Sequence, residues 1–124
     1  MDNKIVVIDD DKDILDVIQF ILAEEGYSVV MYDRLESLEK IAEQKPSVIL
    51  LDNKLGGVYS TDFCLSLKSN QLTKHIPVIL VSASDSLEQL SKQCNADAYL
   101  SKPFDLKDFI KIVKHYVDDF NPLS

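Results

Sequence analysis

The hydrophobic pattern of this chain switches repeatedly between short apolar runs and longer amphipathic segments. The short runs are continuous and rich in branched residues, which is typical of strands covered on both faces. They lie at Ile5–Ile8, Val29–Tyr32, Val48–Leu51, Val78–Val81 and, more briefly, Ala98–Leu100. Strand and helix therefore alternate five times, and this order predicts a parallel sheet with right-handed crossovers and helices on both faces.

The amphipathic segments carry signals for where each helix begins and ends. Asp11 is the expected N-cap of the first helix and Gly26 its expected end, while Asp105 is the expected N-cap of the last. The remaining helices are expected from Leu35 to a point before Pro46, over 61–69, over 87–94 and over 106–117. Five units of this length predict an α/β fold, a flavodoxin-like doubly wound (βα)5 three-layer sandwich around a central five-stranded parallel sheet.

Length and composition predict one ordinary globular domain. The chain has 124 residues, of which 46% are hydrophobic and 27% charged, and this is enough to bury a single core. We expect residues 1–124 to form that domain, with residues 118–124 as a short C-terminal tail and no output domain.

Several classes of protein are disfavoured by simple features of the sequence. No apolar stretch approaches the ~20 residues of a membrane span, and no signal peptide is present, so we expect a cytoplasmic protein without a membrane partner. A net charge of −8 argues against nucleic acid as a direct partner. Cys64 and Cys94 lie thirty positions apart without a CxxC motif, which predicts reduced, buried thiols rather than a metal site or a redox pair.

Charged and hydroxyl residues follow the predicted strands, where a parallel sheet gathers its ligand-binding groups. Asp9 and Asp10 follow the first strand, Asp52 the third, Ser82 the fourth and Lys102 the fifth. Each residue alone is ordinary in a turn or helix cap, but the sheet brings all of them to one edge. Carboxylates gathered there repel each other, so either some are protonated or a cation lies among them. An all-oxygen acidic cluster suits Mg²⁺ better than zinc.

Four segments carry a resemblance to a known family: VVIDDDKDI, VILLDNKLGG, IPVILVSAS and ADAYLSKPFD. Together, in this order and at these spacings, they resemble the receiver domain of two-component response regulators over essentially the whole chain. The resemblance implies that Asp52 is the phosphoacceptor. It also implies that Asp9, Asp10, the Asp52 carboxylate and the backbone carbonyl of Lys54 hold Mg²⁺.

The same resemblance assigns the remaining site residues and the partners. Ser82 would hydrogen-bond the phosphoryl oxygens, Lys102 would pair with them through its ammonium, and Tyr99 would be the aromatic switch residue. The Lys102–Pro103 peptide bond would be cis. The phosphoryl donor would be a sensor histidine kinase or a histidine phosphotransfer protein, and a downstream protein would read the change. The domain would be a monomer that catalyses only its own phosphotransfer and autodephosphorylation, although dimerisation on phosphorylation is common in the family.

The sequence departs from the family pattern in the loop after Asp52. Many receivers have an apolar pair and Pro-Gly there, whereas Asn53-Lys54-Leu55-Gly56-Gly57 predicts a looser turn, and Ser60 stands where glycine is frequent. Lys54 and Ser84 lie two residues beyond Asp52 and Ser82, at positions that control water access in the family. We therefore expect Lys54 to modulate the lifetime of the phosphoryl group.

Other functions agree less well with the sequence. A haloacid-dehalogenase-type phosphatase places a second Asp two residues after its nucleophile, and this chain has Lys54 there. A nucleotide or flavin binder lacks support because neither GxGxxG nor GxxxxGK[ST] occurs. A degenerate receiver acting as a phosphorylation-independent protein-binding module would be expected to lack Asp52 or Lys102, and both are present.

Overall fold

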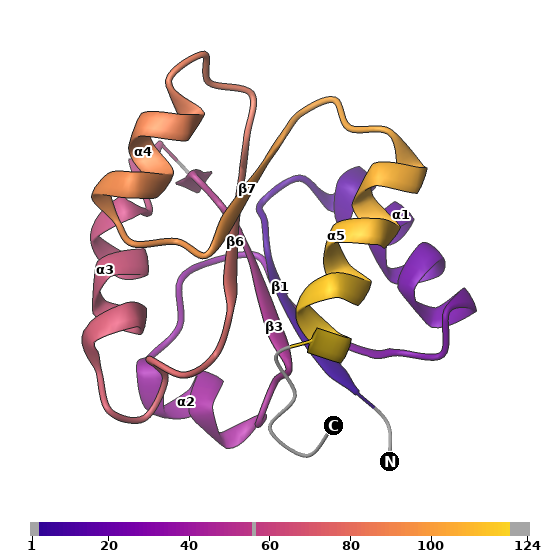
Figure 1. The fold of residues 1–124 in the computed structure, drawn as a ribbon, viewed down its shortest axis with the longest axis horizontal. Helices are drawn as coiled ribbons and strands as arrows, with labels where there is room; N and C mark the ends of the chain where they lie inside the picture. The colour runs from indigo at the N-terminus through magenta and orange to yellow at the C-terminus, as the bar shows by residue number, and fades with distance from the viewer. Residues whose placement is uncertain (1–2, 56, 120–124) are drawn as a thin grey trace.

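A parallel sheet forms the centre of the computed structural model, which describes residues 3–55 and 57–119 (Figure 1). The five strands run in the order β2-β1-β3-β6-β7, which is the flavodoxin-like order with strand order reversing beside β1. Their bounds are β1 Lys4–Ile8, β2 Ser28–Tyr32, β3 Val48–Asp52, β6 Val78–Ser82 and β7 Ala98–Ser101. The predicted fold class is confirmed.

Helices cover both faces of this sheet and complete the three layers (Figure 1). Helices α1 and α5 pack on one face, and α2, α3 and α4 on the other. The bounds are α1 Lys12–Glu24, α2 Leu38–Glu43, α3 Thr61–Ser69, α4 Leu87–Gln93 and α5 Leu106–Asp119. Among the described residues, no helix is both long and apolar enough to cross a membrane.

Alternate residues of the central strands fill two separate cores. Ile8, Leu51 and Leu80 pack with the helices α2, α3 and α4, and their neighbours in sequence face α1 and α5. The central strands β3 and β6 are buried along their whole length, whereas the residues of edge strand β2 are all partly exposed. Continuous apolar runs in the sequence therefore correspond to strands covered on both faces.

The predicted helix caps are present in the structure. The Asp11 carboxylate accepts hydrogen bonds from the backbone N–H groups of Asp13 and Ile14, at 3.0 and 3.3 Å. The Asp105 carboxylate accepts from the backbone N–H of Lys107 at 2.7 Å. Gly26 follows α1 with a φ of +87°, which favours glycine.

Two helix boundaries differ from the prediction. Helix α2 begins at Leu38 rather than Leu35, because the Ser37 hydroxyl caps it by accepting from the backbone N–H of Lys40 at 3.1 Å. Helix α5 continues through Asp119, so Asp118 and Asp119 belong to the helix and not to the predicted tail. The rest of that predicted tail, residues 120–124, lies outside the described residues.

The loop after β3 also differs from the looser turn predicted for it. Residues Lys54–Leu55 form strand β4 and pair antiparallel with Val58–Tyr59, strand β5. Gly57 has a φ of +84°, a conformation that suits a tight hairpin connection; Gly56 lies outside the described residues. The segment that follows Asp52 in the sequence is therefore a paired hairpin.

Candidate functional site

Three carboxylates meet at the carboxyl edge of the sheet. Asp9 directly follows β1, Asp52 ends β3, and β1 and β3 are paired neighbours. One carboxylate oxygen from each of Asp9, Asp10 and Asp52 lies within 4.8 Å of the others. Asp9 and Asp52 are 3% and 8% exposed, while Asp10 is exposed. The structure thus brings together the acidic residues that the strand ends predicted.

Both oxygens of the Asp9 carboxylate have hydrogen-bond partners. Oδ1 accepts from the backbone N–H of Asp11 at 2.9 Å, and Oδ2 accepts from Nζ of Lys102 at 2.9 Å. The backbone N–H of Asp9 donates to the carbonyl of Tyr32 on β2 at 3.1 Å. Asp9 is therefore held in place by three different parts of the chain, and its carboxylate has a fixed orientation.

Lys102 places its ammonium between two carboxylates. Its Nζ lies 2.9 Å from Oδ2 of Asp9 and 3.6 Å from Oδ1 of Asp52. Burial alone would lower the pKa of Lys102, but the hydrogen bond and charge of Asp9 together with the charge of Asp52 raise it above its ordinary value. The backbone N–H of Lys102 donates to the carbonyl of Ser82 at 2.9 Å, and the Lys102–Pro103 peptide bond is cis as expected. This lysine is charged and points at the acidic cluster.

The surroundings of Asp52 disfavour the charged form of its carboxyl group. Burial, followed by the charge of Asp9, raises the pKa of Asp52 from 3.8 to about 6, and Lys102 only partly offsets this. The backbone N–H of Lys54 hydrogen-bonds to the carboxylate and also favours its charged form. One lysine therefore does not neutralise three carboxylates, and a cation bound by their oxygens would do so. The donors are all hard oxygen atoms, which fits Mg²⁺.

Serine side chains occupy the other side of Asp52. Ser82 ends β6 and is 7% exposed, and its Oγ accepts from the backbone N–H of Ser84 at 3.0 Å. An oxygen that accepts this bond keeps its own proton to donate elsewhere. The hydroxyls of Ser84 and Ser86 lie 3.1 Å apart. Ser82 is anchored in the sheet, where its carbonyl accepts from Lys102, whereas residues 83–86, which lead directly into α4, have short-range hydrogen bonds through Ser84 and Ser86.

Ser60 contributes a contact that the sequence did not predict. Its buried hydroxyl donates to the backbone carbonyl of Asp52, and its backbone N–H donates to the carbonyl of Asn53 at 2.7 Å. These bonds tie the start of α3 to the end of β3 across the hairpin. The only available signal was a serine at a position where related sequences often have glycine, and that signal does not identify the partner atom.

The two remaining predicted residues, Lys54 and Tyr99, are exposed. Nζ of Lys54 lies 5.7 Å from the ring centroid of Tyr59 in the hairpin partner strand β5, a cation–π contact. Tyr99 lies on β7 opposite Leu80 of β6 and is 42% exposed. The structure therefore does not use Tyr99 as a core residue, which leaves its ring accessible at the edge of the sheet beside α4.

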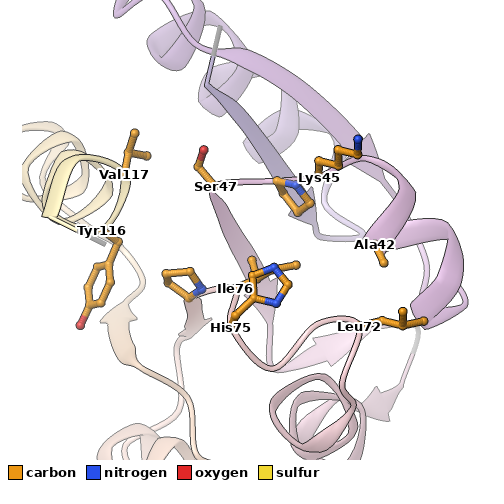
Figure 2. A pocket seen from close by; sticks show the side chains of 10 residues that line it. Ala42, Lys45, Ser47, Leu72, His75, Ile76, Tyr116 and Val117 are labelled. Atoms are coloured by element: carbon orange, nitrogen blue, oxygen red, sulfur yellow. The ribbon is translucent and has the colours of Figure 1, made fainter. Parts of the chain in front are cut away.

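Among the cavities formed by the described residues are two that lie at opposite ends of the molecule. One of about 440 Å³ adjoins the acidic site and is lined by Lys102, Phe104 and apolar residues of α1 and α5, including Val17 and Leu106. The other, of about 550 Å³, is formed by the segments after α2 and α3 and by the end of α5 (Figure 2). Figure 2 shows His75 and Tyr116 lining it, and none of the predicted site residues does. His75 is an exposed loop residue.

Comparison with known proteins agrees with this geometry. Residues 5–114 match the family described as the Response regulator receiver domain. A CheY-like response regulator receiver domain protein from Methanospirillum hungatei JF-1 is 30% identical, with all of both chains covered and a TM-score of 0.84. The chain therefore belongs to the response regulator receiver family.

More distant structures share the fold. The chemotaxis protein CheY4 of Vibrio cholerae is 22% identical, with 94% of this chain and 99% of that chain covered and a TM-score of 0.81. NtrX from Brucella abortus is 23% identical with a TM-score of 0.80, and the match covers 97% of this chain but 28% of NtrX. Receiver domains are signalling domains of two-component systems rather than classical enzymes, and phosphorylation-dependent switching is their general function.

Proposed function

We propose that this domain is a signalling switch in which Asp52 accepts a phosphoryl group from a phosphohistidine on a sensor kinase or a histidine phosphotransfer protein. One observation carries the proposal. The Asp52 carboxylate lies at a strand end within 4.8 Å of two other carboxylates and 3.6 Å from a lysine ammonium. Phosphoryl transfer needs positioning and charge neutralisation more than covalent machinery, and this arrangement supplies both.

The acidic cluster supplies the ligands for the metal. The carboxylates of Asp9, Asp10 and Asp52 would hold Mg²⁺ together with the backbone carbonyl of Lys54. The bound ion would neutralise charge on the phosphoryl oxygens as they approach the carboxylates. Support for this assignment comes from the donor chemistry: three carboxylates with oxygens within 4.8 Å of one another lie beside the ammonium of Lys102.

Transfer itself exchanges one bond at phosphorus. An oxygen of Asp52 bonds to phosphorus while the P–N bond to the donor imidazole breaks, and the electron pair of that bond leaves with the nitrogen. Lys102 lies close enough to Asp52 to contact a phosphoryl group on that carboxylate without a large movement. Because this lysine is charged and already oriented by Asp9, it stabilises the new negative charge at little cost in reorganisation.

Ser82 and the loop that follows it, up to Ser86, respond to the new charge. A phosphoryl group adds about −1.5 to −2 charges at neutral pH on a phosphoserine-like scale, and it attracts the proton that Ser82 retains. A shift of the Ser82–Ser86 loop moves the start of α4 and opens space for the ring of Tyr99 on β7. The surface formed by α4, β7 and α5 then changes, and a downstream protein partner binds one form in preference to the other.

The surface beside the site suits a partner that delivers the phosphoryl group. Val17 and Leu106 line the cavity next to Lys102 and are 52% and 51% exposed. Phe20, one helical turn after Val17, is 69% exposed. An exposed apolar surface of this kind is typical of a protein interface. We propose that the phosphohistidine-bearing protein covers this surface while its imidazole reaches Asp52.

Intact-protein mass spectrometry tests the proposal. The protein is incubated with Mg²⁺ and acetyl phosphate, alongside Asp52→Asn and a sample treated with EDTA. We expect one added phosphoryl group in the wild type and none in either control. A folded wild-type protein that forms no adduct, with rapid hydrolysis excluded by a time course, would instead indicate a phosphorylation-independent binding module.

A further inference from the structure

Two cysteines that take no part in the proposed function lie side by side in the core. Cys64 belongs to α3 and Cys94 is the C-cap residue of α4. Both are fully buried, and both belong to the apolar cluster beneath α2, α3 and α4. Both thiols are free and buried, as predicted, but the sequence also predicted that they are not a redox pair, and their contact in the structure argues against that part of the prediction. Their thirty-residue separation in sequence gave no sign that the two residues meet, and the structure shows that they do.

The contact between the two residues is direct. Sγ of Cys64 donates to the backbone carbonyl of Cys94 at 3.4 Å, and Sγ of Cys94 donates to the carbonyl of Ser91 at 3.7 Å. The thiols also interact with each other. A hydrogen bond to Cys94, followed by burial, raises the pKa of Cys64, and the same hydrogen bond lowers the pKa of Cys94. Cys94 is therefore the thiol that more readily becomes the nucleophilic thiolate.

We propose that Cys64 and Cys94 form a reversible intramolecular disulfide, a modification site that links α3 to the end of α4. With hydrogen peroxide as the oxidant, the Cys94 thiolate attacks one peroxide oxygen, and the O–O bond breaks to give a sulfenic acid. The hydroxide released takes the proton lost by Cys94 and leaves as water. The sulfur of Cys64 then attacks the sulfenic sulfur, its proton leaves with the departing hydroxyl as a second water, and the S–S bond forms. Two thiols are oxidised and one peroxide is reduced; a dithiol reductant reverses the step.

Burial favours this product over others. Neither cysteine is exposed, so bulky thiols in solution reach them poorly, whereas the thiol of Cys64 already contacts Cys94. A small oxidant gains access when α4 opens locally. Helix α4 has only seven residues, and its N-cap residue Ser86 makes no side-chain capping bond. The start of α4 is thus a point from which an opening of this short helix can begin, and Cys94 lies at its other end.

The link would limit how far α4 can move. Helix α4 begins just after the Ser82–Ser86 loop, and fixing its other end to α3 opposes a shift of the whole helix. This consequence rests on the proposed function, in which the loop transmits phosphorylation to α4. The disulfide itself is detected without any phosphodonor, so failure of one proposal is distinguishable from failure of the other.

The disulfide is tested by oxidation of the native, reduced protein. The sample is treated with a small excess of hydrogen peroxide, quenched with catalase, denatured, alkylated and digested with trypsin without reduction. Each cysteine falls in a different tryptic peptide, covering residues 55–68 and 93–107. We expect these two peptides to be joined, with a mass two hydrogens lower than their sum, and to separate after dithiothreitol treatment.

Other outcomes would overturn the inference. These are two alkylated cysteines after prolonged oxidation, sulfinic or sulfonic acid without a joined peptide, or a link found only between two copies of the chain. The variants Cys64→Ser and Cys94→Ser should give no joined peptide. The control variant Lys114→Ala, at an exposed lysine of α5 paired with Glu25 at 3.4 Å, should give it at the wild-type rate.

Discussion

The two sides of Asp52 are built differently. On the acidic side, both oxygens of Asp9 are hydrogen-bonded, one of them to Lys102 from the far end of the chain. The loop there leads into the thirteen-residue helix α1, which Asp11 caps with its side chain. On the serine side, the Ser82 hydroxyl accepts from the nearby backbone N–H of Ser84 and its carbonyl from the backbone N–H of Lys102, and the following helix α4 has seven residues and no side-chain N-cap bond.

This difference separates two tasks. Groups that stabilise a transferred charge are most effective when already oriented, because no reorganisation is then required at the moment of reaction. Groups that report the charge must move, and segments with few long-range bonds move at low cost. The acidic side fits the first task and the serine side the second, so a single residue at the boundary, Asp52, connects the chemistry to the response.

The largest effect is expected from loss of the oriented ammonium. Lys102→Ala leaves the buried carboxylates of Asp9 and Asp52 without their cation, and we expect the rate of phosphorylation by acetyl phosphate to fall about 100-fold or more. Initial rates of adduct formation by mass spectrometry measure this. The matched control is Lys114→Ala, which removes an exposed lysine paired with Glu25 at 3.4 Å. Equal rates in the two variants would contradict the role of Lys102.

The next effect is a pH-dependent change in stability. The pKa of Asp52 is raised from 3.8 to about 6, so the folded state holds this proton more tightly than the unfolded chain. The protonated carboxyl of Asp52 therefore adds to the free energy of unfolding at low pH, and this contribution is lost as pH rises through about 4 to 6. Asp52→Asn has no titrating proton at this position. In EDTA, its free energy of unfolding should therefore rise relative to that of the wild type over the same pH range. At about 1.4 kcal/mol per tenfold change in proton affinity, the gain is at most about 3 kcal/mol.

Urea unfolding at several pH values checks this behaviour. The difference in the free energy of unfolding between Asp52→Asn and wild type should be small near pH 4 and reach its plateau near pH 7. Added Mg²⁺ should stabilise the wild type more than the variant at neutral pH. If the difference in the free energy of unfolding does not change with pH in EDTA, folding does not raise the pKa of Asp52, and this part of the account is contradicted.

A smaller effect is expected from the exposed member of the acidic cluster. Asp10→Asn removes one charge from the proposed metal site while Asp9 and Asp52 stay in place, and we expect Mg²⁺ affinity to fall at least about tenfold. Isothermal titration calorimetry measures the affinity directly. Asp13→Asn, in the first turn of α1, is the control and should bind Mg²⁺ as the wild type does. Unchanged affinity in Asp10→Asn would remove this residue from the site.

The smallest effect concerns the hairpin. The Lys54 ammonium lies over the ring of Tyr59 two residues after Asp52, and we expect it to limit the approach of water to the phosphoryl group. Lys54→Ala should therefore shorten the lifetime of the phosphorylated form roughly two- to threefold, about 0.5 kcal/mol in activation free energy. The decay of the adduct after removal of acetyl phosphate measures it. A lifetime equal to that of Lys114→Ala would exclude a role for Lys54.

The sequence predicted those features that depend on local patterns. Continuous apolar runs predicted the strands because a parallel sheet buries both faces of Val48–Asp52 and its neighbours. Parallel pairing then required that Asp9 and Asp52 meet, since β1 and β3 end at the same edge. The caps at Asp11 and Asp105 followed from the hydrogen-bonding needs of a helix N-terminus.

Features that depend on three-dimensional contact were not predictable in the same way. The pairing of Lys102 with Asp9 rather than with Asp52 alone depends on the path of the loop after β7. The bond from Ser60 to the Asp52 carbonyl and the meeting of Cys64 with Cys94 join segments brought together by packing. The β4–β5 hairpin was missed because strands of two residues have no periodicity to detect.

Amide hydrogen exchange with a phosphoryl mimic tests the central claim most directly. Exchange is compared for the Mg²⁺ form with and without beryllofluoride, in wild type and in Ser82→Ala. We predict that the mimic changes protection in the Ser82–Ser86 loop, α4 and β7 while α1 stays constant, and that Ser82→Ala still binds the mimic but loses most of the change in α4. Equal changes on both sides of Asp52, or an α4 response unaffected by Ser82→Ala, would contradict the division into a fixed acidic side and a moving serine side.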